Sequence, residues 1–140
     1  MNIEQITLYH LRMKLQSAFE TSFGRIHTRD CLLVAMDAEG LTGYGEVAAD
    51  RDPGYSWETC GTAWVTLQDF LIPPFLGQDV KDVADLQERL SPVRGHQMAK
   101  AGLEMALWDL LGKAQGKSLR DLLGGTRLKV DVGVSVGLQE

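Results

Sequence analysis

A chain of 140 residues can form one domain with a hydrophobic core. It is 44% hydrophobic and 24% charged, with a formal net charge of −5 and scattered Lys and Arg residues. Nucleic-acid binding needs a basic stripe, so we expect no nucleic-acid partner. No stretch approaches the length of a membrane-spanning helix, and no basic region followed by an apolar run begins the chain. We therefore expect no membrane partner and a cytoplasmic location.

The first part of the chain predicts a small antiparallel sheet. Residues 9–15 alternate, with Tyr9, Leu11 and Met13 opposite His10 and Arg12, which predicts a strand with one buried face and one wet face. Residues 16–30 show neither helical nor strand periodicity and are expected to form a long loop, either functional or disordered. Two apolar segments, residues 31–37 and 41–49, then flank a turn and are expected to form a hairpin.

Helices are expected to follow. The first begins at Ser56, carries Trp57 on its apolar side and ends before Pro73. A shorter amphipathic helix covers residues 83–90. The third, residues 97–115, is apolar almost all round and should be covered on most sides. Ser118 then caps a short helix that closes at a pair of glycines.

The last segment alternates strictly between apolar and small or polar residues over positions 128–136, as expected of a strand. No strand remains in the chain to pair with it. We therefore expect the sequence to be a fragment, and we expect the isolated chain to show low solubility or to oligomerise through residues 128–136.

Several other motifs indicate structure rather than chemistry. GKAQGKS at residues 112–118 lacks the glycine spacing and the preceding strand of a phosphate-binding loop. The glycines of GYGE, residues 43–46, are expected to allow a bulge or a close backbone approach. Glu104 and Asp109 lie about 140° apart on their helix and are expected to be structural carboxylates. The two cysteines, Cys31 and Cys60, are expected to be buried free thiols.

The stretch AKAGLEMALWDLLGKAQGKSLRDLLGG, residues 99–125, resembles the mandelate racemase and muconate lactonizing branch of the enolase superfamily. TSFGRIHTRD, GYGEVAADRDPGY and VDVGVSVGLQE are most similar to the o-succinylbenzoate synthase and N-acylamino acid racemase subgroup. The resemblance implies an α+β fold, in which an enolase-like N-terminal capping domain has a three-stranded antiparallel sheet and a helical bundle. It implies a capping domain over residues 1–125 and, over residues 126–140, the first strand of a truncated (β/α) barrel.

The resemblance also implies a site. Two cap segments, residues 16–30 and 48–55, would contact a small-molecule carboxylate substrate. By that match Phe19, Phe23 and Tyr55 would form an apolar lid, while Ser135 would face the barrel pocket. The catalytic lysines and the Mg²⁺ ligands of the family lie on later barrel strands. Thus we expect no catalytic residue and no metal in this chain, which should be inactive alone and part of a homo-oligomer.

Three interpretations of the function remain open. The first is the capping region of a Mg²⁺-dependent enzyme that abstracts a proton alpha to a carboxylate, either by dehydration in menaquinone synthesis or by racemisation. The second keeps the enzyme class but changes it to a dipeptide epimerase or muconate cycloisomerase. The third is a stand-alone domain without catalysis.

Overall fold

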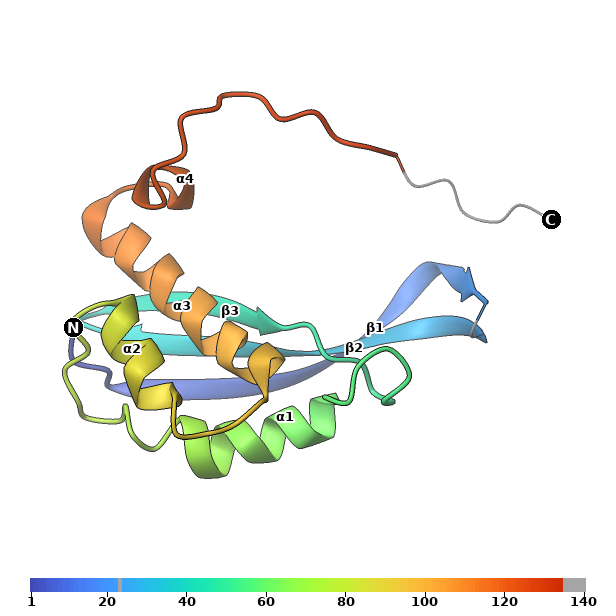
Figure 1. The fold of residues 1–140 in the computed structure, drawn as a ribbon, viewed down its shortest axis with the longest axis horizontal. Helices are drawn as coiled ribbons and strands as arrows, with labels where there is room; N and C mark the ends of the chain where they lie inside the picture. Colours follow the sequence, from blue (N-terminus) through green and yellow to red (C-terminus); the bar gives the residue numbers. More distant parts are fainter. Residues whose placement is uncertain (23, 135–140) are drawn as a thin grey trace.

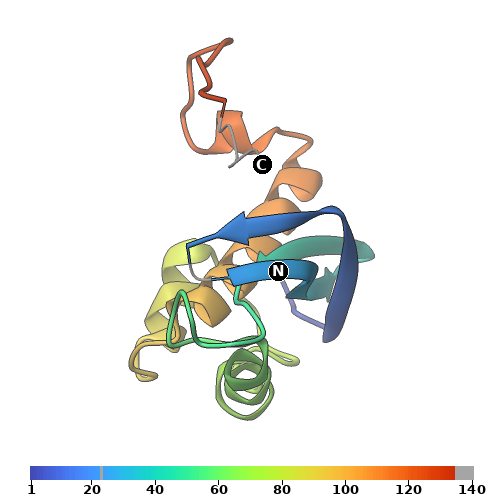
Figure 2. The same ribbon diagram turned by 90° about the vertical axis from the view of Figure 1, so that its right-hand side faces the viewer.

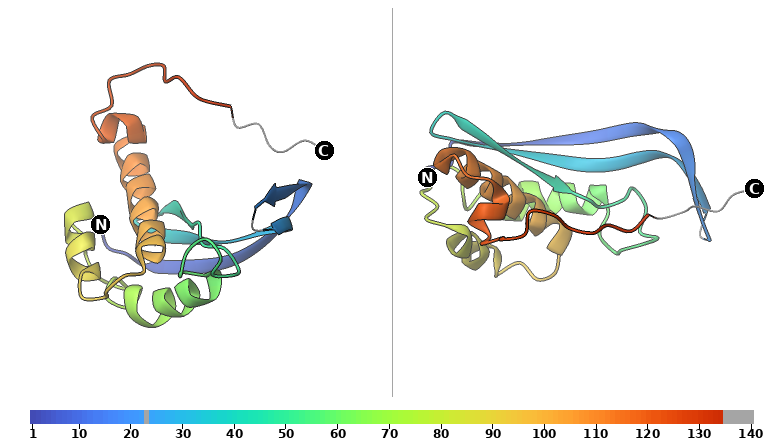
Figure 3. Two further views of the ribbon diagram at one scale, coloured as in Figure 1. Left: turned by 45° about the vertical axis from the view of Figure 1, so that its right-hand side comes forward. Right: turned by 90° about the horizontal axis from the view of Figure 1, so that it is seen from above.

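Three antiparallel strands in the order β1-β2-β3 form the sheet: β1 (Gln5–Thr21), β2 (Gly24–Ala38) and β3 (Leu41–Val47) (Figure 1). The structure is a computed structural model and describes residues 1–22 and 24–134. The helices lie on one side of the sheet, as the view from above shows (Figure 3). This is the expected α+β cap architecture of a three-stranded antiparallel sheet with helices.

Beyond the end of β3, β1 and β2 continue as a two-stranded ribbon that bends away from the sheet (Figure 3). Their pairing is regular as far as Lys14 and Thr28, shifts in register, and resumes at Phe19 and Ile26. The prediction of a loop over residues 16–30 is therefore wrong. The two segments supply each other's backbone hydrogen bonds. Because most side chains there are exposed, the sequence shows no apolar periodicity.

The sheet face that meets the helices holds the core. Buried side chains from β2 and β3 pack there against α3 (Gln97–Gln115). Gly43 and Gly45 let this helix approach closely, since a Cβ on Gly45 would lie 2.0 Å from the carbonyl oxygen of Gly102. The close backbone approach expected from the GYGE motif is confirmed.

The opposite sheet face is open, contrary to the sequence prediction for the first strand. Tyr9, Leu11 and Met13 lie on this face and are exposed. His10 and Arg12 lie on the helix-facing side, where both contact the buried carboxylate of Asp30. The predicted strand is confirmed, but the prediction that its apolar side chains are buried is wrong. Within the described residues, nothing covers the face on which they lie.

The first helix begins later than predicted. α1 (Cys60–Thr66) continues as a π-helix, η1 (Leu67–Leu71), and ends before Pro73. Thr59 is the N-cap, and it exchanges hydrogen bonds with Thr62 in a capping box. Trp57 therefore lies in the preceding loop, outside the helix.

α2 (Val83–Leu90) and α3 complete the core, followed by α4 (Leu119–Leu122). The prediction that α3 is covered on most sides is only partly correct, because Met105 on one side is 43% exposed. α3 ends at Gly116, which is left-handed with φ of 61°, and the Ser118 side chain caps α4. The motif at residues 112–118 is thus a helix end and a capped restart, as expected.

α4 and residues 126–134 project away from the rest of the domain (Figure 2). The part of the predicted last strand that the structure describes, residues 128–134, is not a strand. Its four apolar side chains are exposed: Leu128, Val130, Val132 and Val134. A strand needs a neighbour for its backbone hydrogen bonds, and this segment has none within the described chain. Ser135 lies outside the described residues.

Candidate functional site

Two segments meet at one end of the molecule, where the ribbon leaves the sheet (Figure 1). One is the ribbon end, residues 16–30 without the undescribed residue 23. The other is the β3–α1 loop, residues 48–59. They correspond to the two cap segments expected to contact substrate, although the first consists of paired strands rather than a loop.

The ribbon end presents an apolar pair. Phe19 and Ile26 are direct cross-strand partners and so share one face, and they are 60% and 43% exposed. Phe23, also predicted for the site, lies outside the described residues. The sequence prediction missed Ile26, because placing it beside Phe19 required knowing that the two segments pair.

The β3–α1 loop presents two exposed aromatic side chains. Tyr55, a predicted site residue, is 89% exposed, and Trp57 is 80% exposed. Trp57 was missed because its three-residue spacing from Cys60 fits a helix. The proline and glycine of the DRDPGY segment, which precede it, were the signal that the chain was still in a turn-forming region.

Both ends of this loop are anchored to the domain. The Arg29 guanidinium pairs with the Asp50 carboxylate and donates a hydrogen bond of 3.0 Å to the carbonyl of Ala48. At the other end, the buried carboxylate of Glu58 accepts hydrogen bonds from the N–H groups of Met98 and Ala99, at 3.0 and 3.1 Å. Glu58 thereby caps the N-terminus of α3, where an anion is favourable.

Next to the root of the ribbon lies a buried carboxylate with two basic partners. Asp30 accepts from His10 Nε2 at 3.0 Å and from Arg12 Nε at 3.2 Å. Cys31 and Cys60 are buried free thiols, as predicted, and burial raises the pKa of both. They are therefore poor nucleophiles, since the thiolate is the reactive form.

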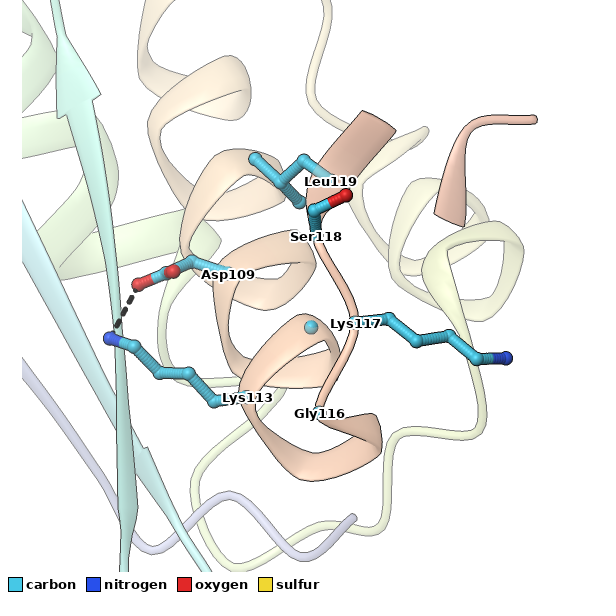
Figure 4. Close-up of a pocket in the computed structure, with 7 residues that line it drawn as sticks. Asp109, Lys113, Gly116, Lys117, Ser118 and Leu119 are labelled. Carbon is cyan, nitrogen blue, oxygen red and sulfur yellow. Dashed lines mark hydrogen bonds and ion pairs between the residues drawn. The ribbon is translucent and has the colours of Figure 1, made fainter. Parts of the chain in front are cut away.

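A surface hollow beside the C-terminal end of α3 does not provide an alternative site (Figure 4). Its Lys113 ammonium donates to Asp109 at 2.8 Å and to the carbonyl of Thr42 at 2.7 Å. The Lys117 side chain extends away from Asp109 and Lys113. The basic groups of this motif are therefore not directed at a common ligand, which agrees with its rejection as a phosphate-binding loop.

The two carboxylates of α3, Glu104 and Asp109, make structural hydrogen bonds, as the sequence predicted. Asp109 accepts from the N–H of Tyr44 at 2.8 Å in addition to Lys113, and Glu104 accepts from Gln87. Burial raises the pKa of Asp109, but the hydrogen bonds from Lys113 and Tyr44 outweigh burial and leave it below its usual value.

The described residues do not fit a magnesium site. Among residues 1–22 and 24–134, no group of three or more His, Cys, Asp or Glu side chains could hold a metal ion. Mg²⁺ in proteins is bound by carboxylate and other oxygen ligands that converge on one point. The same part of the chain holds no helix that is both long and apolar enough to cross a membrane.

The sequence matches the family model of the mandelate racemase / muconate lactonizing enzyme N-terminal domain over residues 3–124. The chain therefore belongs to this family. More particularly, it is 47% identical to the o-succinylbenzoate synthase of Bacillus subtilis, over 97% of this chain and 37% of that enzyme. It is 45% identical to the N-succinylamino acid racemase of Thermus thermophilus, over 99% of this chain and 38% of that enzyme.

Solved structures show the same fold. A member of the enolase superfamily from Listeria innocua superposes with a TM-score of 0.92 at 33% identity, over the whole of this chain and 38% of that one. A muconate lactonizing enzyme from Pseudomonas fluorescens superposes at 0.84 with 27% identity, over 91% of this chain and 34% of that one. The chain thus spans little more than a third of the length of these relatives.

Proposed function

We propose that this chain is the substrate-capping domain of a longer enzyme that removes a proton alpha to a carboxylate, of the o-succinylbenzoate synthase or N-acylamino acid racemase type. The observation that carries the proposal is the identity of 45–47% to both kinds of enzyme across nearly the whole chain. The exposed aromatic and aliphatic side chains at the ribbon end and the β3–α1 loop are the surface that would meet the substrate.

In this proposal the cap contributes binding rather than bond-making. A proton alpha to a carboxylate is weakly acidic, and the intermediate that forms when it leaves carries extra negative charge. In this superfamily a base and bound Mg²⁺ supply that chemistry. We assign both to the part of the protein outside this sequence, so the 140-residue chain should be inactive alone. A protein of Roseovarius nubinhibens, which shares this fold at 28% identity, was solved with magnesium.

Phe19, Ile26, Tyr55 and Trp57 would close over the apolar part of the substrate and exclude water. Exclusion of water strengthens the electrostatic interactions inside a site and protects a reactive intermediate. Phe23 and Ser135 remain proposed contacts by family resemblance. We further propose that the enzyme is a cytoplasmic homo-oligomer.

The proposal is tested with the full-length protein and Mg²⁺. One assay follows the loss of water from the cyclohexadiene carboxylate substrate of the synthase, and the other follows racemisation of N-succinylamino acids. Activity in either assay is expected, with Phe19→Ala and Tyr55→Ala raising KM more than they lower kcat because they remove binding contacts. Inactivity in both assays, with activity on a dipeptide or on muconate, would replace it with the corresponding alternative.

The mass of the natural gene product separates the enzyme from a stand-alone domain. We expect a mass more than twice the 15.4 kDa of this sequence. A natural product that matches 15.4 kDa would contradict the enzymatic proposal, because the base and the metal ligands would have no place in the chain.

A further inference from the structure

We propose that Arg29 is a positioning residue that holds the ribbon end and the β3–α1 loop in one relative arrangement, so that the proposed cap closes on its substrate as a unit. This inference rests on the proposed function. Arg29 pairs across the ribbon with Met13, and only the Lys14–Thr28 pair separates it from the register shift. It therefore lies at the root of the ribbon end.

The guanidinium reaches two acceptors on the neighbouring segment. Nη1 contacts the Asp50 carboxylate, and Nη2 donates to the Ala48 carbonyl at 3.0 Å. A planar guanidinium can satisfy two acceptors in a fixed geometry, whereas a lysine ammonium acts as a single point of charge. The pair is only partly exposed, with side-chain exposures of 31% for Arg29 and 38% for Asp50. It is therefore better shielded than an ordinary surface pair.

Because Asp50 also contacts the far end of the β3–α1 loop, its pairing with Arg29 restrains both ends of that loop. Its backbone carbonyl accepts from the N–H of Cys60 at 2.8 Å, and it forms a parallel bridge with Thr59, the N-cap of α1. The two ends of the loop are thus joined at Asp50, and Arg29 fixes that junction to the ribbon. The exposed aromatic side chains, Tyr55 and Trp57, lie between the joined ends.

Loss of this connection should mainly weaken substrate binding. The two segments would then have to be ordered relative to each other when substrate binds, and that ordering opposes binding. In the full-length protein we expect Arg29→Met to raise KM about tenfold, with a much smaller change in kcat. Arg29→Lys should lie between Arg29→Met and the unchanged protein, because it keeps the charge but loses the second donor.

Limited trypsin digestion gives a readout independent of activity. Arg51 is exposed in the loop directly after Asp50, so cleavage after Arg51 reports how often the loop opens. Arg29→Met and Asp50→Asn should both accelerate this cleavage, and the double variant should add little to either, because the two residues act through one contact. Arg120→Met removes a partly exposed arginine–aspartate pair on α4 and serves as the matched control.

Unchanged cleavage after Arg51 in both single variants, or fully additive effects in the double variant, would overturn the inference. Should Arg29→Met fold poorly, Asp50→Asn, which replaces one carboxylate oxygen with an amide group, decides the same question. Failure of the proposed function appears differently: the unchanged full-length protein would lack both activities, and the tryptic rates would still show whether Arg29 holds the loop.

Discussion

At the scale of single residues, the packing of α3 on the sheet depends on glycines, which have no side chain to keep the helix away. A Cβ on Gly45 would lie 2.0 Å from the backbone oxygen of Gly102 and 2.7 Å from the backbone nitrogen of Ala106. Neither is the end of a flexible side chain, so the helix itself would have to move. The closeness of the helix to β3 therefore depends on glycine at this position.

We expect Gly45→Ala to lower the free energy of unfolding by about 1–3 kcal/mol, the usual cost of overpacking a core. Urea unfolding followed by circular dichroism measures this. Gly61→Ala on α1 is the control: its added Cβ meets nothing closer than 3.7 Å, so this change should be neutral or slightly stabilising. Equal midpoints for Gly45→Ala and the unchanged protein would show that α3 can shift without loss.

At the scale of elements, the sequence predicted those parts in which one face is buried. The hairpin of β2 and β3, α2 and α3 all bury an apolar face; α2 and α3 have the predicted bounds, and the hairpin is present, although β2 begins at Gly24 rather than at residue 31. The ribbon over residues 16–30 buries little, so its strands carry no apolar alternation and could not be recognised. Ile26 and Trp57 were missed for related reasons, because their positions depend on pairing and on a cap that spacing alone does not reveal.

Another element-scale feature is the contact that joins α3 to β3 through Asp109. Its folded-state pKa is lowered, so its contribution to stability is present above the unfolded pKa of about 3.9 and is lost as the pH falls through the folded value. The Asp109 side chain is partly buried and has two donors, Lys113 and the Tyr44 N–H. Acidification below about pH 4 should therefore weaken this contact.

We expect Asp109→Asn to lose about 1 kcal/mol of stability at pH 7, because Asn keeps the acceptor for Tyr44 but not the charge for Lys113. The difference from the unchanged protein should shrink as the pH falls below the unfolded pKa of about 3.9 and should vanish once Asp109 is protonated in the folded state, since both side chains are then neutral. Urea midpoints over a series of falling pH values measure it, with Asp69→Asn on η1 as the control. The pKa values of Asp85 and Asp121 are also lowered, but these groups are present in both proteins and cancel. A pH-independent difference would contradict the assignment.

At the scale of the whole molecule, large apolar side chains are exposed on three separate parts of the described chain. Tyr9, Leu11 and Met13 line the sheet face away from the helices. A groove between β3, α3 and α4 adds Tyr44 and Met105. The segment after α4 adds four further aliphatic side chains, all more than 70% exposed, at residues 128–134. Apolar patches of this kind mark surfaces that other protein covers, or sites of association.

The segment at residues 128–134 differs from the sheet face in one respect that decides where association starts. The strand that carries Tyr9, Leu11 and Met13 is an edge strand, β1, which pairs with β2 along one side, whereas residues 128–134 pair with no strand of the described chain on either side and carry alternating apolar side chains. A segment of that kind can pair with another copy of itself and bury both sets of groups. The 140-residue chain produced alone should therefore form dimers or larger species through this segment, as its alternation predicts.

Sedimentation velocity over a wide range of concentration tests this expectation with two matched double variants. Val130→Lys with Val132→Lys should shift the chain towards monomer, because two like charges would face each other in a paired strand. Leu11→Lys with Met13→Lys places the same charge on the sheet face and should have the smaller effect. A larger effect of the second pair would move the association surface to the sheet. A monomer at every concentration in the unchanged chain would show that neither surface associates, and the exposed segment would then have to be explained by contacts with the rest of a longer protein alone.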